Sequence, residues 1–561
     1  MSTSLQRTGP ITPLAHQPPL PRRDLILEEA PDPEAVPMDV VFVGGGPAGL
    51  AGAIELARLV KADNEAGGGL GDIEIGVLDK AGQLGEHNLS GAVVNPRALR
   101  ALFPDVPVEE LPLRRPVTKE AVYLMTERRA LRLPTPPTMK NHGNYVASIS
   151  EIVRWMGERA EALGVNVFPG FPADALLVEG SRVLGVRTTP SGLDRDGQPA
   201  GADAMPPMDI TARVTVLSEG TRGTLSQAYY EWQDVRSLNP QIYALGVKEL
   251  WEVKRPLDRV IHTLGWPLPR DAFGGSFIYP LDDDLVAIGL VVGLDYRDAR
   301  FDVHQALQVL KTHPLVRPML EGGEMVEWGA KTIPEGGYYS VPERRHGDGI
   351  CIVGDAAGYV DVPSLKGIHY AMESGILAAR AIFEALKADD TSETGLAAYT
   401  RAVDQSYIMA DLKRTRNMRL AFKSGFFAGG LKAGLMTLTR GAFPGGRIPV
   451  EEDAAEPRVL GEGLGDFQPD GTLTFSKVDA VYKSGNQTRD DIPSHLVAAE
   501  DVPPEVAELY VHMCPAGVYE LDEEGNLRVN PPNCVDCKAT DVLGPRWRPR
   551  EGGSGPAYRR M

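Results

Sequence analysis

The fold of the first part of this chain is decided by residues 38–57, which read Met38-Asp-Val-Val-Phe-Val-Gly44-Gly-Gly46-Pro-Ala-Gly49-Leu-Ala-Gly-Ala-Ile-Glu-Leu-Ala57. A β-branched apolar strand runs into a G-x-G-x-x-G turn, and an apolar helix follows. Gly44 is expected to make the tight turn, Gly46 to admit a pyrophosphate, and Gly49 to let helix and strand pack closely. The helix N-terminus would then face the phosphates, so the pattern predicts a dinucleotide-binding fold.

A second strand supports this prediction. Residues 73–78 read Ile73-Glu-Ile-Gly-Val-Leu78, a strand pattern, and Asp79 follows directly, an acid placed to accept a ribose hydroxyl. The acid arrives later than is usual because the Gly-rich stretch at residues 65–72 lengthens the crossover. The alternative, a glycine-rich turn that binds nothing, does not explain the strand, helix, strand and acid together.

A late Gly-Asp turn favours FAD over NAD. Residues 348–358 form another apolar strand that ends in Gly354-Asp355-Ala-Ala-Gly358, and a helical pattern begins near Gly367. In flavoproteins with two dinucleotide folds, such an Asp serves the ribityl chain, and the dipole of the next helix stabilises the anionic reduced flavin. The alternative role of Asp355 is that of a helix N-cap.

Residues 236–335 read as a long insertion that contains Phe273-Gly274-Gly275-Ser-Phe277 and a buried strand at 285–292. Paired glycines between aromatic residues expose backbone N–H groups beside flat apolar surfaces. This combination suits a planar ring with carbonyl oxygens, such as a quinone. A β-turn flanked by core aromatic residues is the simpler alternative.

The segment 411–450 departs from the acidic character of the chain. It holds one acid, Asp411, and a stripe at helical spacing formed by Phe427, Leu431, Leu435 and Leu438. Its eight basic residues are Lys413, Arg414, Arg416, Arg419, Lys423, Lys432, Arg440 and Arg447. A basic amphipathic segment predicts docking on an anionic membrane surface. The alternative is a core helix with a solvated basic edge.

Three of the four cysteines lie near the C-terminus, as Cys514-Pro and Cys534-Val-Asp-Cys537-Lys-Ala-Thr540. A C-x-x-C-x-x-C run with a remote Cys-Pro is how ferredoxin-type chains hold an iron–sulfur cluster, but Thr540 stands where the third cysteine of the run would be. Inert thiols or an incomplete Zn site are the alternatives. The fourth cysteine, Cys351, lies in an apolar strand pattern typical of a buried, inert thiol.

Composition limits the class of protein. A formal net charge of −18 over 561 residues argues against nucleic-acid binding, and no apolar run reaches the length of about 18 residues that a membrane-spanning helix needs. Residues 1–37 are Pro-rich and lack the continuous apolar run of a signal peptide, which predicts a disordered tail rather than a secretion signal. Thiols used as metal ligands predict a reducing compartment, so the soluble parts should face the cytoplasm.

Taken together, these motifs closely resemble one family, electron-transfer flavoprotein:quinone oxidoreductase. The likeness runs from about residue 38 to the C-terminus. One specific stretch reads His87-Asn-Leu-Ser90-Gly91. The full set of specific stretches is residues 87–92, 141–145, 262–268, 274–277, 363–369, 372–379, 514–520, 533–541 and 552–558.

The resemblance implies an α/β fold. It implies a two-dinucleotide-fold, glutathione-reductase-like FAD domain (38–235 and 336–410), an α+β quinone-binding insertion (236–335), a membrane-surface segment (411–450) and a ferredoxin-like domain (451–561). By the resemblance, the quinone head falls to Gly274 and Gly275, and three cluster ligands fall to Cys514, Cys534 and Cys537. The residues that it assigns to FAD are Gly44, Gly46, Gly49, Asp79, Ser90, Gly91, Gly354, Asp355 and Gly358.

The same resemblance implies a function. Electrons would arrive from a soluble electron-transfer flavoprotein and leave through FAD to membrane quinone, with the protein held peripherally at the cytoplasmic face of the inner or cell membrane. The family carries a four-iron cluster, whereas Thr540 predicts a three-iron, labile or absent one here. The alternatives are a related reductase that saturates isoprenoid chains, a flavin monooxygenase, and a membrane-bound carrier that makes no quinol.

Overall fold

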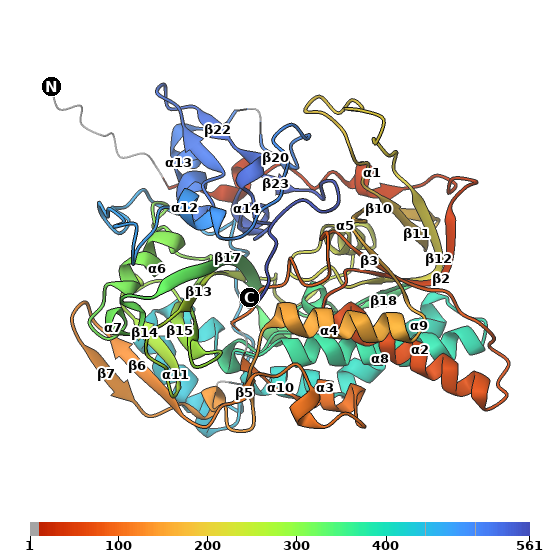
Figure 1. Cartoon of the computed structure of the whole chain (residues 1–561), viewed down its shortest axis with the longest axis horizontal. Helices are drawn as coiled ribbons and strands as arrows, with labels where there is room; N and C mark the ends of the chain where they lie inside the picture. The colour runs from red at the N-terminus through yellow and green to blue at the C-terminus, as the bar shows by residue number, and fades with distance from the viewer. Residues whose placement is uncertain (1–9, 92, 444, 500) are drawn as a thin grey trace.

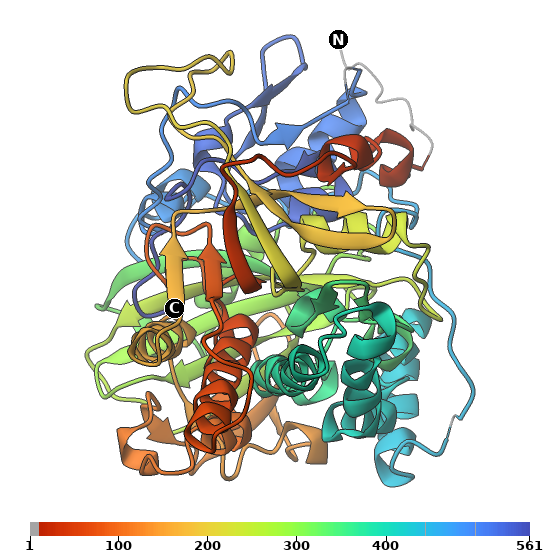
Figure 2. The same ribbon diagram turned by 90° about the vertical axis from the view of Figure 1, so that its right-hand side faces the viewer.

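A computed structural model describes residues 10–91, 93–443, 445–499 and 501–561. Two large sheets form its centre, and the C-terminal part of the chain lies at one end of the molecule, opposite the helices α2, α3 and α8 (Figures 1 and 2). Each sheet has its own apolar core, because each packs helices against its buried face.

The first sheet is built around β2, the strand predicted before the glycine turn. Parallel neighbours flank β2 on both sides, and its residues 40–43 are buried, as expected for a strand covered on both faces. In spatial order the main strands are β1 (Ile26–Leu27), β10 (Ala173–Glu179), β11 (Arg182–Thr188), β12 (Asp209–Leu217), β2 (Val36–Val43), β3 (Ile75–Asp79) and β9 (Asn166–Pro169). The strand β19 (Ile350–Ile352) pairs with β12 and with β18 (His346–Gly347).

Two long helices cover this sheet in close contact. They are α2 (Pro47–Glu65) and α8 (Ile368–Lys387), and α4 (Ile149–Ala162) packs beside α2. A Cβ at Gly375 would lie 2.1 Å from the carbonyl oxygen of Ala48, so only glycine lets the two helices approach this closely. The other helices of this part are α3 (Arg97–Leu102), α5 (Thr224–Trp232), α9 (Glu393–Gln405) and α10 (Tyr407–Thr415).

The second sheet is larger than the insertion predicted from the sequence. Its order is β17 (Glu324–Pro334), β13 (Tyr243–Glu252), β16 (Leu285–Gly293), β15 (Gly274–Pro280), β14 (Val260–Gly265), β6 (Glu120–Met125) and β7 (Ala130–Leu133). The last two strands come from the stretch that the sequence assigned to the FAD domain, and β6 pairs with β14 in parallel. The helices α6 (Val303–Lys311) and α7 (Arg317–Leu320) pack at this sheet.

The prediction of a disordered tail over residues 1–37 is wrong for the part that the structure describes. Residues 10–37 pack on the protein: Ile11 is buried and pairs with Arg458, and β1 pairs with β10. Backbone hydrogen bonds to distant segments order this stretch, and a Pro-rich composition gives no sign of such partners. It holds η1 (Pro13–His16) and α1 (Arg22–Leu25), whereas residues 1–9 lie outside the described residues.

The C-terminal part has little regular structure. It contains α12 (Lys477–Tyr482), α13 (Pro504–Met513), α14 (Ala539–Leu543) and the pairs β20 (Leu496–Val497) with β23 (Arg546–Trp547) and β21 (Tyr519–Leu521) with β22 (Leu527–Val529). The final residues leave this part and insert between the sheets, where the Met561 carbonyl accepts hydrogen bonds from Ser148 (3.0 Å) and Ser150 (3.3 Å).

The remaining elements are short. The strands β4 (Val93–Val94), β8 (Tyr145–Val146) and β5 (Arg115–Pro116) make a small sheet, and α11 (Phe426–Leu438) packs on the preceding η7 (Leu420–Ser424). The other 3₁₀ turns are η2 (Val108–Glu110), η3 (Pro137–Met139), η4 (Gly337–Ser340), η5 (Gly354–Ala357), η6 (Val362–Ser364) and η8 (Pro531–Asn533).

Candidate functional site

One cavity of about 700 Å³ joins the parts that the sequence singled out. Its wall includes the first glycine turn, the late Gly-Asp turn, the glycine pair of β15 and one face of α11. The predicted residues that line it are Gly44, Gly46, Asp79, Ser90, Gly91, Gly274, Gly275, Gly354 and Asp355. Gly49 and Gly358 do not appear in the wall.

The three glycines of the first turn differ in what they must avoid. Gly44 has a φ of +111°, and a Cβ there would lie 2.4 Å from the Ser218 carbonyl oxygen. A Cβ at Gly49 would lie 2.2 Å from the Gly44 carbonyl oxygen, so this glycine serves the packing of helix on strand. Gly46 has no such constraint, because its nearest neighbour would be the Asn88 side chain at 3.6 Å. Protein packing therefore does not require a glycine at position 46, whereas a phosphate group beside the N-terminus of α2 would.

Asp79 helps to hold the same turn. Its carboxylate accepts hydrogen bonds from the backbone N–H groups of Gly45 and Ala81, each at 2.8 Å. Burial raises the pKa of Asp79. Each carboxylate oxygen keeps a second lone pair, so the side chain can still accept from a ribose hydroxyl.

Asp355 lies where the N-terminus of α8 meets the cavity. Gly367 and Ile368 line the cavity beside it, and burial raises the pKa of Asp355 to about 6. The turn is closed through the backbone carbonyl of Asp355, which accepts from the Gly358 N–H at 3.0 Å. Gly358 has a φ of +81°, so its role here is to end the turn in the left-handed region.

Several lysines in the wall, among them the buried Lys248 and the half-buried Lys331, were missed by the sequence reasoning. Lys248 on β13 donates to the Ser90 carbonyl at 2.9 Å, and Lys331 lies on the neighbouring strand β17. Burial lowers the pKa of Lys248 to about 7 and that of Lys331 to about 8. A lysine inside an otherwise apolar strand pattern was the available signal, since buried lysines are rare without a partner or a function.

The glycine pair Gly274 and Gly275 lines the cavity, but the sheet also requires it. A Cβ at Gly274 would lie 2.2 Å from the Val291 carbonyl oxygen, and one at Gly275 would lie 2.4 Å from that of Thr263. The two glycines are therefore explained by close strand packing alone. A bulky substitution at either position would disturb the sheet as well as any ligand.

The helix α11 presents two apolar faces. Phe427, Leu431 and Leu438 are 77%, 69% and 82% exposed, so the stripe found in the sequence points to solvent rather than into a core. An adjacent side of the helix lines the cavity through Phe426, Gly430, Ala433, Gly434 and Thr437. The cavity thus opens beside an exposed apolar surface.

The basic character of the segment 411–450 is smaller at the surface than its composition suggests. Arg419 is buried and pairs with Asp295 and Glu335, and Lys423 pairs with Asp295 and Glu456. These two residues stabilise the protein interior rather than facing a membrane. The exposed basic residues are Lys413, Arg414, Lys432, Arg440 and Arg447.

A second, small cavity lies in the C-terminal part. The predicted ligands Cys514, Cys534 and Cys537 line it together with Thr540, so these four side chains do converge. Lys538 lines both this cavity and the large one. Burial raises the pKa of all three thiols, so their thiolate forms need a bound cation to offset the charge.

The hydroxyl of Thr540 is already used by the protein. It donates to the Pro545 carbonyl at 3.2 Å and is hydrogen-bonded to the hydroxyl of Tyr519. A hydroxyl with both bonds in place is a poor iron ligand, so the residues fit a cluster held by three thiolates better than one held by four side chains.

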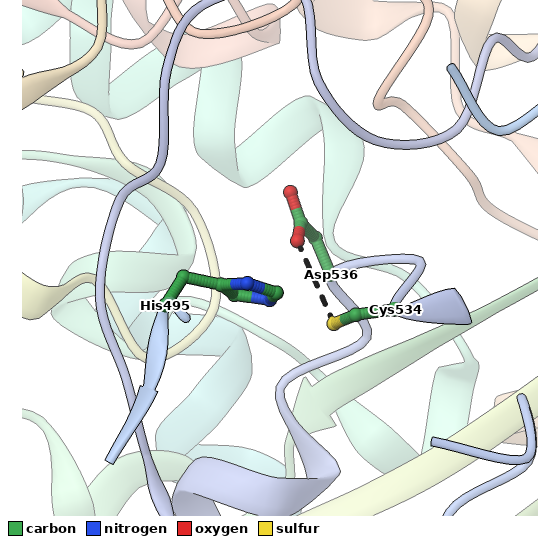
Figure 3. A group of neighbouring side chains, drawn as sticks. All are labelled: His495, Cys534 and Asp536. Carbon is green, nitrogen blue, oxygen red and sulfur yellow. Dashed lines mark hydrogen bonds between the residues drawn. The ribbon is translucent and has the colours of Figure 1, made fainter. Parts of the chain in front are cut away.

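His495 faces the sulfur of Cys534, with Asp536 beside them (Figure 3). His495 is buried, and neither ring nitrogen has a hydrogen-bond partner among the described residues. Asp536 is held by Arg550 (3.0 Å), Trp547 (3.1 Å) and Lys80 (2.5 Å). The unsatisfied imidazole fits a site where a cluster would supply the missing acceptor.

None of the helices in the described part of the chain is both long enough and apolar enough to cross a bilayer.

Two family models match the chain. One, described as "ETF-QO, ubiquinone-binding", matches residues 243–333, and the other, "Electron transfer flavoprotein-ubiquinone oxidoreductase, 4Fe-4S", matches residues 471–559. The first match covers β13 to nearly the end of β17, and the second covers the cysteine-lined cavity.

Full-length relatives agree with these matches. A protein of Oryza sativa subsp. japonica is 39% identical, over 94% of this chain and 93% of its own length. Proteins of Rattus norvegicus (38%) and Homo sapiens (37%) each match 93% of this chain and 89% of their own length. All three are named mitochondrial electron transfer flavoprotein-ubiquinone oxidoreductase.

Solved structures show the fold. A geranylgeranyl bacteriochlorophyll reductase-like protein from Thermoplasma acidophilum superposes with a TM-score of 0.56 at 18% identity, over 73% of this chain and 97% of its own. A flavin-dependent brominase gives 0.50 at 17% identity, over 72% and 94%. The predicted α/β flavoprotein fold is thereby confirmed, and the match to the 4Fe-4S family model supports the ferredoxin-like C-terminal domain.

The first prediction concerns the glycine that protein packing does not require. Gly46→Val should fold, because its Cβ meets no protein atom closer than 3.6 Å, but the branched side chain should block the pyrophosphate. The purified variant should have lost most of its FAD, measured by absorbance and by cofactor extraction. Gly69→Val, in a loop with no neighbour within 4 Å, is the matched control. Full FAD occupancy in Gly46→Val would show that the cofactor lies elsewhere.

Proposed function

The chain belongs to the electron transfer flavoprotein-ubiquinone oxidoreductase family, and we propose that it passes electrons from a reduced electron-transfer flavoprotein through FAD to a membrane quinone. The resemblance inferred from the sequence is confirmed by relatives that match nearly the whole chain. One observation of the structure carries the function furthest. A single cavity runs from the dinucleotide turn to an exposed apolar helix, so a lipid-soluble acceptor can reach the place where FAD would bind.

The residues of the cavity fit FAD. Gly46 leaves room at the N-terminus of α2 for the pyrophosphate, Asp79 would accept from the adenosine ribose, and Asp355 would accept from the ribityl chain. Ser90 and Gly91 border the same space, and Lys248 fixes the Ser90 carbonyl. When bound, FAD supplies the electron transfer itself, and this chain supplies binding, orientation and charge.

The quinone site lies at the α11 end of the cavity. Gly274 and Gly275 form the inner wall there, and apolar side chains of α11 form the mouth. Aromatic residues follow the glycines, with Phe277 and Tyr279 stacked at 4.8 Å. A flat ring would lie against such surfaces, and its isoprenoid tail would leave along α11 toward the exposed stripe.

The membrane contact follows from the same helix. Phe427, Leu431 and Leu438 would enter the interface of one leaflet, and the exposed basic residues beside them would meet anionic headgroups. The protein would be peripheral, at the cytoplasmic face of the inner or cell membrane, since its buried thiols need a reducing compartment.

The alternatives have less support. The structural likeness to a reductase-like protein and to a brominase is below 25% identity and shows the fold alone. A flavin monooxygenase has no need of the converging cysteines, and a carrier without a quinone product leaves the open apolar mouth unexplained.

The iron–sulfur site has three ligands, Cys514, Cys534 and Cys537. We propose that it holds a three-iron cluster, or a four-iron cluster with one labile iron, because the Thr540 hydroxyl is bonded to Tyr519 and Pro545.

The function is tested by narrowing the mouth of the cavity. Gly430 lines the mouth, and a Cβ there meets no atom within 4 Å, so Gly430→Leu should fold normally and obstruct the quinone. We expect wild type to reduce a ubiquinone analogue with reduced electron-transfer flavoprotein as donor. We expect the variant to lose most of this activity and to keep FAD reduction by the donor. Absence of quinone reduction in wild type would refute the proposed function.

Membrane docking is tested by a charge on the exposed stripe. Leu431→Asp should weaken binding to anionic vesicles, because a carboxylate would enter the apolar interface, and raised salt should weaken wild-type binding through screening. Co-sedimentation with vesicles measures both effects. The control is Val478→Asp on α12, a site that is 61% exposed and outside the stripe. A wild type that ignores anionic vesicles at low salt would contradict the docking proposal.

The cluster is tested by restoring the missing thiol. Thr540→Cys should produce a robust four-iron centre, because cysteine is close to threonine in size and Thr540 already borders the cavity. Anaerobic iron and sulfide analysis with electron paramagnetic resonance should show about three irons or a labile fourth in wild type. Thr540→Val, which adds no ligand, is the control. If neither wild type nor Thr540→Cys contains iron, the cluster proposal is wrong.

A further inference from the structure

A network of ion-paired side chains leads from the large cavity to the protein surface. Glu335 lines the cavity and accepts from Arg419 Nε at 2.6 Å, and Arg419 Nη2 donates to Asp295 at 2.9 Å. Asp295 pairs with Lys423 at 2.8 Å, and Lys423 pairs with Glu456, also at 2.8 Å. Glu335, Arg419 and Asp295 are almost fully buried, whereas the Glu456 side chain is 30% exposed.

The two buried carboxylates of this network both lie close to Gly293, the last residue of β16. A Cβ on Gly293 would lie 2.7 Å from Asp295 Oδ1 and 3.4 Å from Glu335 Oε2. The Gly293 N–H donates to the Phe273 carbonyl at 2.8 Å, directly before the glycine pair of β15. The Arg419 guanidinium lies over the Phe273 ring at 4.3 Å. The inner end of the network is therefore next to the proposed quinone site.

A third buried acid adjoins the network. Asp453 accepts from the Tyr243 N–H at 2.7 Å through one oxygen, and its other oxygen has no hydrogen-bond partner among the described residues. Burial raises the pKa of Asp453 to about 7, and the charge of Asp295 acts in the same direction. Burial also raises the pKa of Glu335, against the opposing charges of Arg419 and Lys423. Burial therefore makes both acids easier to protonate than an exposed carboxyl group.

The other acids in the described wall of the cavity have different tasks. Asp79 holds the first turn, and Glu219 accepts from the N–H groups of Leu225 and Ser226 at the start of α5. Asp355 lies at the N-terminus of α8. Glu335 is the wall acid that lies beside Gly293 of β16, the strand paired with the one that carries Gly274.

We propose that Glu335 gives protons to the quinone oxygens, and that Asp453 and Glu456 return protons to it from solvent, with Asp295, Arg419 and Lys423 holding these acids in place. The proposal rests on the proposed function, in which a quinone is reduced in this cavity. Conversion of a quinone to a quinol takes two electrons and two protons. The electrons come from the donor flavoprotein by way of FAD, and each proton that Glu335 releases to a carbonyl oxygen is replaced by one from water.

The test compares two electron acceptors on enzyme that dithionite has reduced beforehand. Glu335→Gln keeps the shape of the side chain and removes its proton. Oxidation of the reduced enzyme by a ubiquinone analogue should slow at least about 10-fold, as expected for loss of a proton donor. Oxidation by ferricyanide, which takes an electron and no proton, should stay within about twofold of wild type. Small carboxylic acids should partly restore the quinone reaction, and the solvent deuterium isotope effect on it should rise.

A matched control separates this role from a structural one. Glu327→Gln removes another buried carboxylate, on the strand β17 that ends directly before Glu335; it accepts from the backbone N–H groups of Arg559 and Arg560 and lies outside the described cavity wall. It should leave both acceptor reactions unchanged. Glu456→Gln, at the exposed end, should slow the quinone reaction less than Glu335→Gln does.

Two outcomes would overturn the relay. If Glu335→Gln slows both acceptors equally, the ion pairs serve only to hold the α10–η7 segment against the sheet. If it slows neither, protons reach the quinone by another route. Failure of the donor flavoprotein to reduce wild type would count against the proposed function alone, because the relay is measured on chemically reduced enzyme. If the reduced wild type transfers no electrons to the quinone, both the proposed function and the proton relay are wrong.

Discussion

The close crossing of α2 and α8 is the contact on which the cavity depends. A Cβ at Gly375 would lie 2.1 Å from the Ala48 carbonyl oxygen, and one at Gly52 would lie 3.1 Å from the Gly375 carbonyl oxygen. Any larger residue at Gly375 would push the helices apart. Because both helices begin at the cavity, this crossing brings two positive helix ends to the same space. One end faces the proposed pyrophosphate, and the other lies beside Asp355.

The sequence predicted the parts of the site that depend on local patterns. The strand, glycine turn and helix at residues 38–57, the Gly-Asp turn at Gly354 and the converging cysteines all follow from short stretches whose chemistry is specific. The apolar stripe of α11 was also visible, since helical spacing alone puts Leu431 and Leu438 on one side.

What the sequence could not show depends on contacts between distant segments. The strand β6 joins the second sheet through pairing with β14, more than a hundred residues away, and Pro-rich residues near Ile11 are ordered by Arg458. The charge count of the segment 411–450 could not reveal that Arg419 and Lys423 are buried in ion pairs. For the same reason, the sequence could not show that strand packing also requires a glycine at position 274, because the Val291 carbonyl that excludes a side chain there comes from another strand.

The interleaving of the two sheets has a consequence for how this protein folds. The chain visits the first sheet through β1, β2 and β3, crosses to the second for β6 and β7, returns for β9 to β12, and crosses again for β13 to β17 before ending the first with β18 and β19. Neither sheet can be completed from one continuous length of polypeptide. Such non-local pairing makes folding slow and cooperative, and it leaves no single peptide bond whose cleavage would release an independent half. Limited proteolysis should therefore trim loops of the native protein without separating its two sheets, and the binding cavity between them should form late on the ribosome.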